Sequence, residues 1–97
     1  MNKLCKYIEE NHYQLSEISD YINTACERMG VKTNIKKQHI HIWKQGSYLP
    51  RGNHIYKALA QLLEMSVSEV VKDMTQEYLK LRGVNNVYCE QSRIEGI

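Results

Sequence analysis

The feature that most limits the fold of this chain is a run of apolar residues at helical spacing between residues 18 and 29. Their spacing of i, i+3, i+4, i+7, i+8 and i+11 places them on one side of an α-helix. These residues are Ile18, Tyr21, Ile22, Ala25, Cys26 and Met29. Ser16 is expected to cap the N-terminus of this helix, and Gly30 is expected to end it. A helix with one apolar side has to bury that side, so the remaining chain must provide a core.

Four further segments carry the same periodicity. They predict helices over residues 3–10, from Lys36 to Gln45, from Asn53 onward, and from Ser66 to Arg82. The expected core positions of these helices are Leu4, Tyr7, Ile8, Ile35, Ile40, Trp43, Ile55, Ala58, Leu59, Leu62, Leu63, Val67, Val70, Val71, Met74, Tyr78 and Leu81. Because no segment is a convincing strand, the sequence predicts an all-α fold, a compact bundle of about five helices.

Residues 38–43 allow a second interpretation, because QHIHIW alternates polar and apolar residues as an amphipathic strand does. An isolated strand would lack a partner for its backbone hydrogen bonds, and residues 46–52 are rich in turn formers. We therefore interpret the segment as a helix, on which His39 and His41 lie about 200° apart and cannot share a metal ion. Motifs for nucleophiles, phosphate loops and paired carboxylates are lacking, so the sequence predicts no enzyme, no metal site and no cofactor.

Basic residues are concentrated in the middle of the sequence. Between Arg28 and Leu63 there is no Asp or Glu, and this window has a formal charge of +7. Its basic residues are Arg28, Lys32, Lys36, Lys37, Lys44, Arg51 and Lys57. The rest of the chain carries six basic and 11 acidic residues, or −5, although the whole chain has a net charge of only +2. Ordinary solvated surfaces mix both signs, so this segregation predicts a face that attracts a polyanion.

Length and cysteine content limit the class of protein further. A chain of 97 residues corresponds to one small domain. Its three cysteines are widely spaced and form no C-x-x-C pair, so reduced thiols are expected rather than disulfides or a zinc site. No apolar run approaches the roughly 20 residues that span a bilayer, and the N-terminal residues do not resemble a signal peptide. We expect a cytoplasmic protein with no membrane association.

A set of residues between positions 16 and 71 follows a recognisable order. The segment contains Ile40-x-x-Trp43-x-x-Gly46, then Pro50, then Ala60-x-x-Leu63-x-x-Ser66. This order resembles the Xre/Cro/cI type of helix-turn-helix proteins, found in phage repressors and their bacterial relatives. The chain departs from the family pattern in a longer path from Gly30 to Trp43 and in Lys44, where the family often has an acidic residue. The resemblance implies a lambda-repressor-like DNA-binding domain over residues 1–82 and a C-terminal tail, residues 83–97.

The resemblance also implies a sequence-specific double-stranded DNA-binding transcriptional regulator, most simply a repressor. The helix from residue 36 to 45 would lie in the major groove as its recognition helix. Its base-reading residues would be Lys37, Gln38, His41 and Ile42, with Ile42 pointing outward to a thymine methyl group. The phosphate contacts would come from Lys36, Lys44, Gln45, Ser47, Tyr48, Arg51, Asn53 and His54. A single short helix reads few base pairs, so a homodimer on a palindromic operator is expected.

The sequence leaves one alternative open. The same scaffold could serve as a protein-interaction module, such as an antitoxin or an inhibitor of a nucleic-acid enzyme, with a partner protein on the basic face. The C-terminal segment bears on both hypotheses, because it is too apolar for a pure linker. Its apolar residues are Val84, Val87, Tyr88, Ile94 and Ile97. We expect the segment from Tyr78 to Ile97 to contribute to self-association as a dimerisation element.

Overall fold

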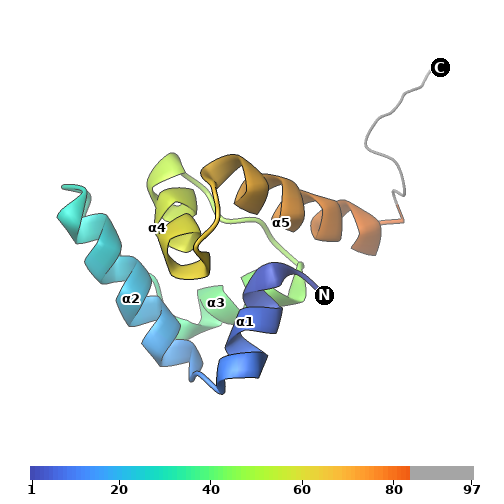
Figure 1. Ribbon diagram of the computed structural model, residues 1–97, viewed down its shortest axis with the longest axis horizontal. Coiled ribbons are helices and arrows are strands. Elements are labelled where there is room, and N and C mark those ends of the chain that lie inside the picture. The colour runs from blue at the N-terminus through green and yellow to red at the C-terminus, as the bar shows by residue number, and fades with distance from the viewer. Residues whose placement is uncertain (84–97) are drawn as a thin grey trace.

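The computed structural model describes residues 1–83, which form five α-helices (Figure 1). The helices are α1 (Lys3–Asn11), α2 (Leu15–Arg28), α3 (Lys37–Gln45), α4 (Asn53–Leu63) and α5 (Val67–Leu81). Helix α2 packs on α3 and α4, α5 packs on α4, and α1 contacts α3, α4 and α5. The predicted all-α bundle is therefore confirmed for this part of the chain. The expected role of the C-terminal tail in dimerisation falls on residues 84–97 and lies outside the described residues.

All five helices contribute to one hydrophobic core. Its largest side chains with almost no exposed surface are Leu4, Ile18, Ile22, Ile40, Leu59, Val70 and Met74. Trp43 is buried beside them, as the helical interpretation of QHIHIW requires. Burying each large apolar side chain contributes roughly 1.5 to 3 kcal/mol before the entropy of ordering it is subtracted. None of the helices in residues 1–83 is long and apolar enough to cross a membrane.

Four residues that the periodicity assigned to the core are exposed instead. Tyr21 is 39% exposed, and Leu81, at the end of α5, is 56% exposed. Val67 and Val71 are also exposed. For Val67 and Val71 the reason is geometric: α5 packs mainly along the edge that holds Val70 and Met74, and no described element covers the edge that holds these two valines.

The helix ends confirm one predicted N-cap and correct another. The Ser66 hydroxyl accepts from the Glu69 N–H, as expected for the cap of α5. Ser16, in contrast, lies inside α2, which begins at Leu15 with Gln14 as its N-cap, two residues earlier than predicted. The Glu17 carboxylate causes this shift, because it accepts from the Gln14 N–H at 2.7 Å and stabilises the earlier start.

Candidate nucleic-acid interface

Helix α3 begins after a connection, residues 31–36, that is fixed to α2 by one side chain. Asn23 of α2 accepts through Oδ1 from the Thr33 hydroxyl at 2.7 Å and from the Ile35 N–H at 2.8 Å. The Asn23 amide donates to the Ile35 carbonyl at 2.9 Å. The His39 Nδ1 then accepts from the Lys36 N–H at 2.9 Å and caps the first turn of α3. The long path from Gly30 to α3 therefore has a defined course.

The C-terminal end of α3 is held by contacts from both ends of the described chain. Asn2, which is buried, donates from its side-chain amide to the Trp43 carbonyl at 2.9 Å and caps α1 through its Oδ1. Gly46 adopts the left-handed conformation (φ 81°) that ends α3, and it lies against Glu77 and Leu81 of α5. Arg82 donates to the Ser47 carbonyl at 3.0 Å. Helix α3 is thus anchored at both ends.

One side of α3 faces solvent along its whole length. Ile40 and Trp43 are buried, and the opposite side consists of exposed polar residues. Those residues are Lys37, Gln38, His41 and Gln45. Three of the four predicted base-reading side chains therefore lie together on an accessible surface with ammonium, amide and imidazole groups.

The expectation that Ile42 points outward is wrong. Ile42 is half-buried and packs against the hydrophobic core. The connection between α3 and α4 passes over this flank of the helix and brings Tyr48 and Leu49 close to Ile42. Because helical geometry alone places Ile42 on the far side from Ile40, only the course of this loop explains its partial burial.

The eight residues predicted to contact phosphates divide into two groups. Five are exposed around the two ends of α3 and the start of α4: Lys36, Gln45, Tyr48, Arg51 and Asn53. The other three, Lys44, Ser47 and His54, are half-buried. The Ser47 carbonyl already accepts from Arg82, and the His54 imidazole lies against Gly52. The exposed group is therefore the more available to a ligand.

The basic residues of the 28–63 window have no carboxylate partners within residues 1–83. The only ion pair in that part of the chain joins the Met1 amino group to Glu77 of α5 at 3.4 Å, and it involves none of the seven basic residues of the window. Four of these cations, Lys36, Lys37, Lys44 and Arg51, lie in or beside α3, and uncompensated cations attract anionic ligands over a distance of about 10 Å at moderate salt. The basic residues that are separated from acidic residues in the sequence are therefore also without ion pairs in residues 1–83.

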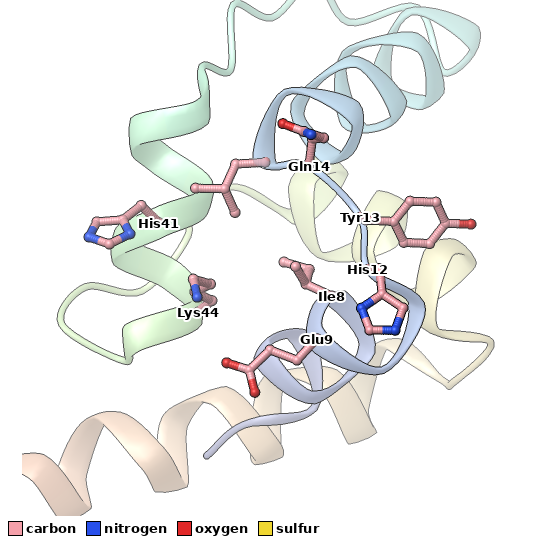
Figure 2. Close-up of a pocket in the computed structure, with 8 residues that line it drawn as sticks. Ile8, Glu9, His12, Tyr13, Gln14, His41 and Lys44 are labelled. Carbon is pink, nitrogen blue, oxygen red and sulfur yellow. The ribbon is translucent and has the colours of Figure 1, made fainter.

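A groove separates α3 from α1 and the turn between α1 and α2 (Figure 2). It has a volume of about 610 Å³, and His41 and Lys44 form its α3 side. From the other side Glu9 brings a carboxylate toward α3, so the cationic surface ends at this groove. His12 and Gln14 also line the groove, and they were not predicted because no motif links the α1–α2 turn to α3.

Two further predictions concern metals and thiols. No group of three potential metal ligands occurs among His, Cys, Asp and Glu residues of positions 1–83. Cys5 and Cys26 are free and buried, and burial raises the pKa of both thiols, which keeps them protonated and weakly reactive. Cys89 lies outside the described residues. The two described thiols are therefore packing residues.

No protein-family model, curated protein or solved structure matches the chain. The anchored helix α3, its exposed polar side and the unpaired cations around it are the features of residues 1–83 that bear most directly on function.

Proposed function

We propose that the protein is a sequence-specific double-stranded DNA-binding regulator of the Xre/Cro type, with α2 and α3 as its helix-turn-helix. In this proposal α3 lies in the major groove and α2 crosses over it. The observation that carries the proposal is the exposed side of α3, which combines base-reading groups with cations that have no carboxylate partner in residues 1–83.

The chemistry of the exposed side suits base edges. Gln38 can donate to adenine N7 and accept from adenine N6, and Lys37 can donate to guanine O6 or N7. His41 follows Lys37 by one helical turn and could reach a neighbouring base pair. Lys36, just before α3, and Arg51, just before α4, would hold phosphates and set the position of the helix without reading sequence.

The proposal includes a homodimer bound to a palindromic operator. Helix α3 has nine residues and a length of about 13 Å, so one copy can contact only a few base pairs. Two copies related by a two-fold axis would read two half-sites about one turn of DNA apart. Occupying such a site near a promoter would make the protein a repressor. Residues 1–82 would form the DNA-binding domain, and the tail from residue 83 would assist dimerisation.

Selection from random duplexes at physiological salt tests the proposal and yields the operator. On the selected site, Gln38→Ala is expected to cost roughly 1 to 3 kcal/mol and to relax specificity at one base pair. Arg51→Ala is expected to weaken binding to all duplexes and to reduce the slope of log K against log salt by about 1. Lys72→Ala, which removes an exposed cation from α5, is the matched control and should change neither quantity.

The proposal fails if the wild-type protein shows no salt-dependent binding to any duplex. That result would favour the alternative function, a protein-interaction module such as an antitoxin or an inhibitor of a nucleic-acid enzyme. One observation speaks for this alternative: Tyr48 is 61% exposed beside α3, and exposed tyrosines are enriched in protein interfaces.

A further inference from the structure

An apolar depression lies beside α3, on the flank away from the groove of Figure 2. It has a volume of about 310 Å³ and lies between α3, the loop before it and the loop after it. Its lining residues are Ile35, His39, Ile42, Trp43, Tyr48, Leu49, Arg51 and Ile55. Most of these side chains are apolar, and Arg51 is the one residue of this lining with a permanent charge. The depression is therefore an apolar surface inside the cationic window of the sequence.

The position of this depression relates it to the base-reading side of α3. Ile42 follows Gln38 by four residues, so the two lie one helical turn apart along the same flank. Tyr48 and Leu49 line the same depression as Ile42. A duplex seated on Gln38 would therefore bring the next base pairs of the major groove toward Ile42, Tyr48 and Leu49.

Charge decides which partner fits this surface. A partner protein would cover the apolar depression but would have to compensate Lys36, Lys37 and Arg51, which have no carboxylate within reach in residues 1–83. A nucleic-acid duplex supplies phosphates for those cations at regular spacing. On its major-groove base edges it offers one apolar group, the C5-methyl of thymine.

We infer that this depression binds thymine methyl groups and makes the protein select thymine at positions next to the base pair read by Gln38. The inference rests on the proposed DNA-binding function and adds a specificity determinant to it. Ile42, Tyr48 and Leu49 all line the depression, and Tyr48 is the most exposed of the three. Tyr48 thereby contributes its ring to base recognition, in addition to the phosphate contact expected from its hydroxyl group.

Replacement of thymine by deoxyuridine tests the inference, because it removes the methyl group and leaves every hydrogen-bonding group of the base in place. Each thymine of the selected operator is replaced in turn, and affinity is measured by fluorescence anisotropy at fixed salt. Replacement at a thymine bound in the depression should weaken wild-type binding about three- to fivefold, as expected when one buried methyl-sized group is lost. Replacement elsewhere should change affinity less than twofold.

Variants of Tyr48 identify the surface that reads the methyl group. Tyr48→Ser should remove most of the discrimination between thymine and deoxyuridine, whereas Tyr48→Phe should retain it because the ring is unchanged. Tyr48 is exposed, so neither variant should disturb folding. Tyr21→Ser, at an exposed tyrosine of α2, is the matched control and should leave the discrimination unchanged.

The outcomes separate this inference from the function on which it rests. If the wild type binds its operator but treats thymine and deoxyuridine alike at every position, the inference is overturned and the DNA-binding function stands. If Tyr48→Ser and Ile42→Ala both leave the discrimination intact, the inference is also overturned, and the depression is left for a protein partner. If no duplex is bound at all, the proposed function fails first.

Discussion

Removing the Asn23 side chain should destabilise the connection that leads into α3. Asn23 makes three hydrogen bonds to residues 33–35, and all three are partly buried. In Asn23→Ala the Ile35 N–H and carbonyl both lose their side-chain partner. Since α2 itself keeps its helical backbone bonds, the effect should be concentrated on the position of residues 31–36 and of the first turn of α3.

The magnitude follows from the number of bonds and their exposure. A typical intramolecular hydrogen bond contributes about 0.5 to 1.5 kcal/mol net, so three bonds set an upper range of about 1.5 to 4.5 kcal/mol. Water can reach a half-buried site and replace part of this loss, so we expect about 2 kcal/mol for Asn23→Ala. For a domain of this size, that corresponds to a fall in Tm of roughly 8 to 16 °C.

Urea unfolding followed by the fluorescence of Trp43, the single tryptophan of the chain, measures this change. Thr24→Ala is the matched control, because Thr24 is the exposed neighbour of Asn23 on α2. Thr33→Val removes one of the three bonds and should cost less than Asn23→Ala, and it should add little in the Asn23→Ala background. Amide exchange at Ile35 should quicken in Asn23→Ala.

An Asn23→Ala protein within about 0.5 kcal/mol of the wild type would refute this reasoning, since such a value is usual for surface substitutions without a structural role. The same conclusion would follow if Thr24→Ala were equally destabilising, or if exchange at Ile35 were unchanged.

Two further predictions concern helix ends. Gly46→Ala should destabilise the protein by more than Gly30→Ala, because both glycines have φ above 80° but a Cβ at Gly46 would lie 2.9 Å from Glu77 and Leu81 side-chain atoms, whereas Gly30 has open space. Conformational strain alone costs about 1 to 2 kcal/mol, so Gly30→Ala sets the baseline in urea unfolding, and equal values for the two variants would contradict the packing argument. At the start of α5, the backbone N–H of Ser66 and then its hydroxyl lower the pKa of Glu69, so this carboxylate stabilises the fold at neutral pH. That contribution should fade as the pH falls through the lowered pKa. Unfolding free energies of wild type and Glu69→Gln should therefore differ at pH 7 and converge once the pH has fallen below the lowered pKa, and a constant difference would contradict the assignment.

Helical periodicity was sufficient to predict the number and order of the helices in residues 1–83. Each helix has apolar residues that recur every three to four positions, and Gly30 and Gly46 lie where helices end. Periodicity could not predict which of these apolar residues are covered by another part of the chain. Val67 and Val71 follow the pattern of a core helix but remain exposed, because α5 is covered along one edge only.

The exposed side of α3 could be predicted from the sequence, since Ile40 and Trp43 fix the orientation of the helix. The partial burial of Ile42 could not be predicted from the sequence, because it depends on the loop after α3. Tertiary contacts, such as the hydrogen bond from Arg82 to the Ser47 carbonyl, set the course of this loop. Asn2 and Asn23 were missed for a related reason: their partners are far along the chain. A weak signal existed at Asn23, because asparagine is unfavourable inside a helix unless its side chain has a specific partner.

The hydrogen bonds that hold α3 in place do not involve its exposed side chains, so these side chains can be changed without affecting the fold. Asn23, Asn2 and Arg82 all bond to backbone atoms at or near the ends of α3, at Ile35, Trp43 and Ser47 respectively. Backbone bonds do not depend on which side chains point to solvent. Substitutions of Lys37, Gln38, His41 or Gln45 should therefore leave the free energy of unfolding within about 0.5 kcal/mol, so that any loss of DNA affinity reports recognition. A substitution at Gln38 that lowered stability by several times this amount would show that the exposed side of α3 also supports the fold.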